Sequence, residues 1–406
     1  MKITDLKTTV VAMPLSKVTP TSIVIFGESP LLSVLVEVIT DAGITGIGES
    51  PVVNGAEICK SMIDSVKPLL IGEDPFKIER LRKKLYARFN LVHFHLHAAN
   101  WAFSGIDTAL WDIVGKSCRQ PLHRLWGGGY RDKVNFWGWV PHGTFSTIQE
   151  ESRRYVQEGF DCLYLKVGID RKHDIESVKA IRDAVGYDVD LRIDANQAWT
   201  PSGAIRMIKK MEKYDLEMVE QPVLMYNLDA LARVRNAVST PILSHESSWT
   251  FHDTLNVLKH DAADVVQLDP RFDAGVWGFR VAAGMAEAAG IGAVAHSFGE
   301  LGVATALMIQ AIASSPSFIY ANQTAYPFLS DDVIKGGMMK FENGHLPVPK
   351  DPGLGVEFDP VKVEKYSRLY EQEIRGREFE TPWQSPRKFL GLKDDTADWI
   401  PMPAQY

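Results

Sequence analysis

Cysteine is scarce in this sequence, with three among 406 residues, at Cys59, Cys118 and Cys162. Their odd number and wide spacing exclude a disulfide framework and a paired-cysteine metal site. We expect three reduced thiols in a cytoplasmic protein. No stretch approaches the roughly 20 uninterrupted apolar residues of a membrane-spanning helix. The charges within the first seven residues also argue against a signal peptide.

An excess of basic residues is also missing, since 44 Lys and Arg stand against 51 Asp and Glu and the formal net charge is −7. This balance makes nucleic acid and anionic membranes improbable partners. It does not exclude a small anionic substrate, because a local site can be cationic within an acidic protein. Apolar residues make up 45% and charged residues 23%, which is typical of a folded globular chain.

The first 130 residues have the pattern of an α+β domain, with strands first and helices after them. Asp41-Ala42-Gly43 reads as a hairpin turn, since glycine readily adopts the positive φ that such turns need. The residues between 15 and 30 form either a mobile lid or a solvated connection. We expect strands at 2–13, 31–40 and 44–49, and helices at 55–68, 76–88 and 97–117.

From residue 134 onward, short apolar runs of strand length alternate with helical stretches. The eight runs end at intervals of 23 to 27 residues, as repeating βα units predict. Alternating strands and helices imply a parallel sheet, and eight units can close into a barrel. The expected strands are 134–140, 162–167, 189–194, 216–220, 241–246, 264–269, 291–296 and 317–322.

Six of these strands end on an ionisable residue, and in a parallel barrel all such ends lie on the face that carries the active site. A single polar strand end is common, but six of catalytic types are much less so. The six are Lys166, Asp194, Glu220, Glu246, Asp269 and His296.

Asp194, Glu220 and Glu246 end three consecutive strands, so their carboxylates are expected to crowd together. Crowded carboxylates repel one another, and a hard divalent cation resolves the repulsion. An all-oxygen ligand set favours Mg²⁺. Each carboxylate taken singly could instead be a solvated group or a helix N-cap.

Lys166 and His296 are expected on opposite sides of this metal site, with Asp269 beside His296. A carboxylate next to an imidazole fixes its tautomer and raises its pKa. Bases flanking a metal-bound carboxylate can remove the α-proton, and the cation stabilises the resulting enediolate. The plainer alternatives are a surface lysine and a buried structural histidine.

The ordered motifs of the chain resemble those of the enolase superfamily, in the branch of mandelate racemase and the acid-sugar dehydratases. The resemblance spans Met1 to about Asp359, and no single motif decides it. The motifs are DAGITGIGES (41–50), LLIGEDP (69–75), SGIDTALWDIVGK (104–116), LRIDANQAW (191–199), MVEQP (218–222), VVQLD (265–269), VAHSFGELG (294–302) and PGLGVEFD (352–359).

The resemblance implies an α/β fold, a (β/α)7β modified TIM barrel under an N-terminal α+β capping domain. It implies a capping domain at 1–130 and a barrel at 131–360, followed by a C-terminal extension at 361–406. The segments 15–30 and 50–55 would form the lid. It also implies Mg²⁺ on Asp194, Glu220 and Glu246, and a His296–Asp269 dyad.

Three positions bear on which branch the chain resembles. The muconate-cycloisomerase branch usually has lysine where this chain has Asp269, which favours the racemase and dehydratase side. The family's Lys-x-Lys motif is Tyr164-Leu165-Lys166 here, so Tyr164 would donate a hydrogen bond in place of a lysine. The segment Tyr320–Gln323 carries no acid, unlike mandelate racemase, which argues against simple mandelate-type racemisation.

Other polar residues are weaker candidates. Asn196, His245 and Asn322 are candidate substrate-binding residues, although His245 could equally pack with its side chain turned away. His93, His95 and His97 alternate in the manner of a metal-binding strip or of a half-buried segment. The tail offers Trp383, Phe389 and Trp399 as anchors on the barrel or on a neighbouring subunit, or is a loosely held terminus.

We therefore expect a Mg²⁺-dependent lyase that dehydrates an acid sugar to a 2-keto-3-deoxy acid. Here His296 would deliver a proton to the departing β-hydroxyl. A racemase, epimerase or cycloisomerase that shares the first step is the alternative. A non-catalytic barrel that binds a small acid is a further one, made improbable by the full residue set. The expected partners are a small-molecule carboxylate and further copies of the chain in a homo-oligomer.

Overall fold

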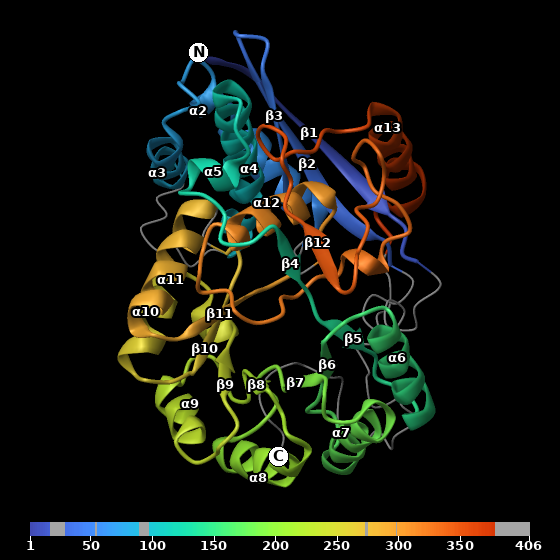
Figure 1. The fold of residues 1–406 in the computed structure, drawn as a ribbon. Coiled ribbons are helices and arrows are strands. Elements are labelled where there is room, and N and C mark those ends of the chain that lie inside the picture. The colour runs from blue at the N-terminus through green and yellow to red at the C-terminus, as the bar shows by residue number, and fades with distance from the viewer. Residues whose placement is uncertain (17–28, 53–54, 89–96, 273–274, 298, 378–406) are drawn as a thin grey trace.

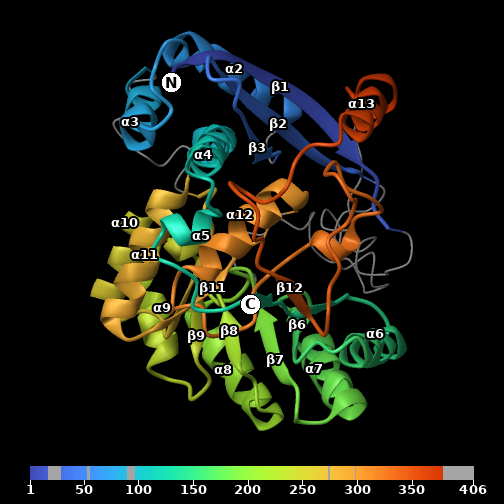
Figure 2. The same ribbon diagram turned by 45° about the horizontal axis from the view of Figure 1, so that its top comes forward.

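A computed structural model describes residues 1–16, 29–52, 55–88, 97–272, 275–297 and 299–377 (Figure 1). An antiparallel sheet with its helices lies over one end of a parallel sheet that is ringed by helices (Figure 2). Residues 17–28 of the expected lid segment 15–30 and residues 53–54 of the segment 50–55 lie outside the described residues. So do His93, His95 and the tail anchors Trp383, Phe389 and Trp399.

The N-terminal part has the strands and helices that the sequence predicts. Its sheet order is β1-β2-β3, all antiparallel. Alternating residues of the middle strand face opposite sides. Val34, Val36 and Val38 pack under the helices, and Leu31 and Leu35 pack toward Leu301 and Tyr326 of the barrel region. The elements are β1 (Ile3–Met13), β2 (Leu31–Thr40), β3 (Thr45–Pro51), α2 (Ala56–Leu70), α3 (Ile78–Arg88) and α4 (His97–Cys118).

Glycines let α4 lie directly on β3. A Cβ atom on Gly48 would sit 1.9 Å from the carbonyl oxygen of Gly105, and one on Gly46 would sit 2.0 Å from that of Ala109. No side chain fits at such distances, so the glycines of the DAGITGIGES motif are required by this backbone contact.

The barrel sheet holds seven parallel strands in the order β11-β10-β9-β8-β7-β6-β5. The strands are β5 (Gly138–Val140), β6 (Cys162–Lys166), β7 (Asp190–Asp194), β8 (Met218–Glu220), β9 (Ile242–Ser244), β10 (Val265–Leu268) and β11 (Gly292–Ala295).

Helices cover the outer face of the barrel sheet (Figure 1). They are α6 (Phe145–Gln157), α7 (Arg171–Val185), α8 (Pro201–Met211), α9 (Leu228–Arg235), α10 (Phe251–Lys259), α11 (Val276–Ala289) and α12 (Gly302–Ala313). The barrel region also contains an antiparallel pair of short strands, β4 (Lys133–Asn135) and β12 (His345–Pro347). Its short helices are α5 (Leu122–Leu125), η1 (Glu212–Tyr214), η2 (Glu246–Ser248) and η3 (Tyr326–Phe328).

The expected eighth strand at 317–322 is wrong in its local structure. The segment does hydrogen-bond to both sheet edges. Ala293 donates to Ser317 (2.8 Å), and Trp137 donates to Asn322 (3.1 Å). However, the side-chain oxygen of Asn322 accepts the N–H of Ala295 (2.8 Å), where a strand would offer a backbone oxygen. The amide group therefore interrupts the ladder that would make this seam a strand.

The chain returns to the capping sheet after the barrel. Helix α13 (Pro360–Leu369) packs against β1, and the π-helical turn η4 (Tyr370–Ile374) follows it (Figure 2). Tyr370 lies in the core of the capping domain and donates to Glu57 of α2 (2.9 Å). The expected domain boundaries stay predictions. Among the described residues, no helix combines the length and the hydropathy that crossing a membrane requires.

Candidate active site

The six polar strand ends of the sequence analysis lie at one edge of the barrel sheet. Lys166, Asp194 and Glu220 are the last residues of β6, β7 and β8, and they are paired in register. Glu246 follows β9 by two residues, and Asp269 and His296 directly follow β10 and β11. Because the strands are parallel neighbours in this order, their carboxyl ends face the same side.

Lys166 and Tyr164 both bind Asp194. The ammonium group pairs with Oδ2 of Asp194, and the Tyr164 hydroxyl donates to the same oxygen (2.6 Å). Burial disfavours the charged ammonium, but the nearby carboxylates, Asp194 above all, outweigh burial and raise the pKa of Lys166. Burial likewise opposes the charge of Asp194, yet Lys166 and Tyr164 hold the pKa of that carboxyl below its usual value. Tyr164 is therefore a hydrogen-bond donor to Asp194.

Glu220 and Glu246 carry buried oxygens with no hydrogen-bond partner. These are both carboxylate oxygens of Glu220 and Oε2 of Glu246. Asn196 donates its side-chain amide to the other oxygen of Glu246 and its backbone N–H to Asp194 (2.5 Å). Burial, followed by the charge of Asp194, raises the pKa of Glu220. One ammonium cannot balance three buried carboxylates, so the region carries an excess of negative charge.

His245 turns into this group of carboxylates. Its Nδ1 lies 3.0 Å from Oε1 of Glu220 and 3.5 Å from Oε2 of Glu246, but it is not aligned for a hydrogen bond to either oxygen. Its ring centroid is 4.5 Å from that of His296. The alternative that this side chain faces away from the site is therefore wrong. The backbone leaves the regular strand geometry after Ser244, so strand alternation no longer sets its direction.

His296 and Asp269 form the expected dyad, with Nδ1 of His296 3.0 Å from Oδ2 of Asp269. An ionised carboxylate can only accept, so Nδ1 carries the proton. Asp269 does raise the pKa of His296, as expected. Burial and the neighbouring His245 outweigh this effect and lower the pKa of His296 to about 3.

Arg271 also contributes to the low pKa of His296, and the sequence analysis missed this residue. Its Nε donates to Oδ1 of Asp269 (2.7 Å) and its Nη2 to Oδ2 (2.6 Å), so the carboxylate charge is shared with a guanidinium. Only its position two residues after Asp269, at the start of a loop, could have indicated this contact.

An aromatic wall, which we define as Trp101, Trp249 and Phe272, borders the two histidines. Trp249 stacks on Phe272 with ring centroids 3.9 Å apart, and Phe272 lies 4.9 Å from the ring of His296. Trp101 comes from α4 of the capping domain and stacks on Trp249 at 6.1 Å. The wall is thus built from both parts of the molecule.

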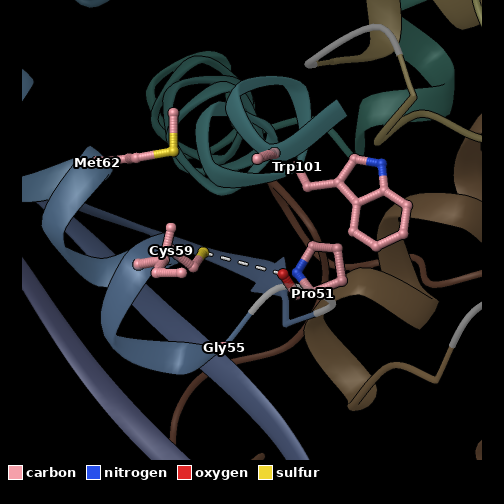
Figure 3. A pocket seen from close by; sticks show the side chains of 7 residues that line it. Pro51, Gly55, Cys59, Met62 and Trp101 are labelled. Atoms are coloured by element: carbon pink, nitrogen blue, oxygen red, sulfur yellow. Dashed lines mark hydrogen bonds between the residues drawn. The ribbon is translucent and has the colours of Figure 1, made fainter. Parts of the chain in front are cut away.

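A small pocket lies next to Trp101 in the capping domain (Figure 3). It has a volume of about 10 Å³, which is room for about one water molecule, and a mostly apolar lining that includes Pro51, Cys59 and Met62. Its lining also includes Gly55, and both Pro51 and Gly55 belong to the expected lid segment 50–55.

Asn322 does not join the other candidates in this arrangement. Its side-chain amide donates to the backbone oxygens of Asn135 and Tyr320, both at 3.2 Å, and its oxygen accepts from Ala295. The side chain is fully buried. This geometry gives Asn322 a structural role at the barrel seam.

The carboxylates fit a hard cation by their chemistry, because three oxygens of Glu220 and Glu246 are buried without a donor. However, no three His, Cys, Asp or Glu side chains within the described residues converge as metal ligands. The contacts of Asp194 explain the difference, since Lys166, Tyr164 and Asn196 already occupy its oxygens.

Comparison with known proteins assigns the family. Residues 6–127 match the family described as the N-terminal domain of mandelate racemase and muconate lactonizing enzyme, and residues 147–362 match the enolase C-terminal domain-like family. The chain belongs to the enolase superfamily. The family and the (β/α)7β fold expected from the sequence are therefore confirmed.

Similar enolase-superfamily proteins differ in their reactions. Arabinonate dehydratase of Saccharolobus solfataricus is 32% identical over 84% of this chain and 91% of its own length. Chloromuconate cycloisomerase of Cupriavidus pinatubonensis is 30% identical over 84% of this chain and 93% of its own. A dipeptide epimerase from Enterococcus faecalis, solved with Mg and the dipeptide L-Leu-L-Tyr, has a TM-score of 0.80 and 28% identity, covering 88% of this chain and all of that one.

Proposed function

We propose that this enolase-superfamily enzyme dehydrates an acid sugar. It would remove the proton α to a carboxylate and expel the β-hydroxyl as water, and the enol product would tautomerise to a 2-keto-3-deoxy acid. The observation that carries the proposal is the arrangement of Lys166 and His296. Each is bonded to a carboxylate, and they stand at opposite ends of the strand-end row that holds Asp194, Glu220 and Glu246.

In this proposal Asp194, Glu220 and Glu246 hold Mg²⁺, which would stabilise negative charge as it develops on the substrate carboxylate. The three buried oxygens without donors support this assignment. Asn196 orients Glu246, and Tyr164 and Lys166 orient Asp194. The Lys166 ammonium is also placed to attract an anionic substrate to this side.

His296 would act first as a base. Its imidazole is neutral because burial holds its pKa near 3, and Nδ1–H is directed at Asp269. Nε2 is then the nitrogen that accepts the α-proton. The resulting imidazolium can return this proton to the departing hydroxyl, so that the C–H and C–O bonds break and water leaves. The sequence leaves open whether Lys166 or His296 takes the α-proton, and this order assigns that step to His296.

Racemisation or epimerisation is the second candidate. Its support is that two groups able to carry protons, Lys166 and His296, come from different strands, as exchange on two faces of one carbon requires. A similar protein is a dipeptide epimerase. The cytoplasmic location, the His245 contact to substrate and the homo-oligomeric state are further predictions.

A screen of acid sugars with Mg²⁺ in D2O tests the proposal, read by proton NMR for loss of the α-hydrogen and by carbonyl trapping of a 2-keto-3-deoxy product. A trapped product supports dehydration, whereas deuterium uptake with no loss of water supports the epimerase. His296→Asn should abolish either reaction. The matched control His260→Asn changes an exposed histidine on the barrel exterior and should leave the rate unchanged. Absence of exchange on every acid sugar would contradict the proposed function.

A further inference from the structure

Arg271 is a buried arginine whose polar contacts all lie beside the dyad. Its side chain is only 6% exposed. Both its backbone N–H (2.8 Å) and its Nε (2.7 Å) donate to Oδ1 of Asp269, and Nη2 donates to Oδ2. A bidentate contact of this kind, with one N–H group on each carboxylate oxygen, fixes the plane of the carboxylate. A lysine ammonium could not do this.

A second carboxylate holds the far side of the guanidinium. Nη1 of Arg271 donates to Oε2 of Glu300 (3.1 Å), and the Ser297 hydroxyl donates to the same carboxylate at 2.6 and 2.7 Å from its two oxygens. Ser297 is tied in turn to Ala325, whose N–H donates to its hydroxyl (3.0 Å). The buried arginine is therefore held from both sides and cannot reorient alone.

The contacts leave Oδ2 of Asp269 shared between Arg271 and His296. A carboxylate that already balances a guanidinium stabilises an imidazolium less than an unpaired one does. The other charged or titratable groups that bear on this pair are His245 beside the imidazole, Glu300, and Glu49 of the capping domain, whose charge acts on Arg271. Arg271 also holds the pKa of Asp269 well below its usual range, against the effect of burial.

We propose that Arg271 is a positioning residue of the reaction, which fixes Asp269 against His296 and, by sharing the charge of that carboxylate, adds to the effects that keep the imidazole neutral until it has taken a proton. The inference rests on the proposed function where it concerns the substrate proton. Its effect on the imidazole is a property of the resting enzyme and needs no substrate. Arg271 itself acts through Asp269.

The experiment follows the ring nitrogens of His296 by NMR in the full-length protein labelled with ¹⁵N-histidine, with the signal assigned from His296→Asn. In the wild type we expect a neutral imidazole protonated on Nδ1 throughout pH 5–8. Arg271→Gln alone would leave Asp269 and Glu300 buried without a counter-charge and could fail to fold. The informative variant is therefore Arg271→Gln combined with Glu300→Gln, which removes one charge of each sign.

In the double variant we expect the His296 titration to move upward by about two pH units, since Asp269 is no longer balanced. Glu300→Gln alone is the matched control, because it leaves the Arg271–Asp269 contacts in place and should not move the titration. Arg271→Lys keeps the charge but loses the bidentate contact. With an accepted substrate, it should lower kcat about tenfold while KM stays within about twofold.

An unchanged His296 titration and tautomer in the folded double variant would overturn the inference. So would an Arg271→Lys enzyme that loses activity only through KM. Failure of the proposed function is a separate result. If no acid sugar reacts but the titration moves as expected, Arg271 retains its role and the reaction assigned to the site is wrong.

Discussion

The Glu49 carboxylate of the capping domain accepts the backbone N–H of Ala304 in the first turn of α12 (2.9 Å). Its other oxygen accepts the N–H of Leu301 (2.7 Å). The N-cap residue Leu301 has no side-chain hydrogen bond to the helix. Glu49, 255 positions away from Ala304, instead accepts backbone N–H groups at the amino end of this helix. Because α12 begins six residues after His296, the capping domain is attached close to the dyad.

Replacing Glu49 with Gln should flatten the pH dependence of stability between pH 5 and 8. Burial raises the pKa of Glu49 to about 7, against the two backbone donors. The folded protein thus keeps a proton that the unfolded chain has released, and wild-type stability falls as pH rises from about 4.5 to 7. The part of this fall in the free energy of unfolding that is due to Glu49 should be about 3 kcal/mol at most. Urea unfolding at four pH values measures it.

Asp107 and Asp174 also have pKa values raised to about 7 by burial, so the wild-type slope is not due to Glu49 alone. The difference between wild type and Glu49→Gln isolates its part. Glu287→Gln, on the exposed face of α11, is the control and should keep the wild-type slope. A Glu49→Gln slope equal to that of wild type would contradict the assigned protonation of Glu49.

One of the three thiols should react with iodoacetamide in the native protein. Cys118 is exposed, whereas Cys59 and Cys162 are buried. Burial raises the pKa of Cys59 to about 12, so its reactive thiolate is scarce at neutral pH. Mass spectrometry should find the label on Cys118, and Cys118→Ser should remove it. Rapid labelling of Cys59 or Cys162 without denaturant would be inconsistent with the described core.

Tyr164→Phe should slow turnover about tenfold without unfolding the protein. The change removes the hydrogen bond to Asp194 but keeps the ring between Trp137 and Trp139, whose centroids lie 5.0 and 5.2 Å away. The melting temperature should therefore change little while kcat falls. Equal activity in both proteins would show that this hydroxyl has no part in ordering Asp194.

Glu220→Gln should stabilise the metal-free protein or leave it unchanged, and should abolish the stabilisation by Mg²⁺. Both oxygens of Glu220 are buried without a donor, so removing the charge relieves an unfavourable burial. Thermal melts with and without MgCl2 measure both effects. Glu287→Gln again serves as the control and should respond to Mg²⁺ as wild type does. A full Mg²⁺ response in Glu220→Gln would remove this residue from the proposed ligands.

Trp249→Leu should raise KM about tenfold for any accepted substrate and change kcat by less than about threefold. The indole belongs to the aromatic wall, where it stacks on Phe272 and Trp101 and lies beside the rings of His245 and His296. Trp277→Leu, on the barrel exterior, should change neither constant. A loss confined to kcat would assign Trp249 to proton transfer and not to substrate binding.

The strand-end residues could be predicted because a parallel βα repeat forces every carboxyl end to one edge. Lys166 and His296 were placed on that argument alone. The eighth strand could not be predicted correctly, because whether residues 317–322 form a ladder depends on where the Asn322 amide points. A hydropathy pattern does not contain that information.

The residues that the sequence analysis missed depend on contacts between distant segments. Arg271 looks like an ordinary loop arginine until the loop folds back on Asp269. Trp101 joins Trp249 only when the capping domain is seated on the barrel. Glu49 caps a helix some 250 positions further along the chain, and no local pattern marks such a partner.

The contact of β3 with α4 through Gly48 and Gly105 links Glu49 and Trp101 mechanically. Backbones this close leave no room for one element to slide over the other, so Glu49 on β3 and Trp101 on α4 move as one piece. Tilting the capping domain would then shift the wall and the amino end of α12 together. Capping segments exchanged to change the substrate range would therefore have to include both β3 and α4 with their glycines. Otherwise the aromatic wall would no longer be aligned with His296.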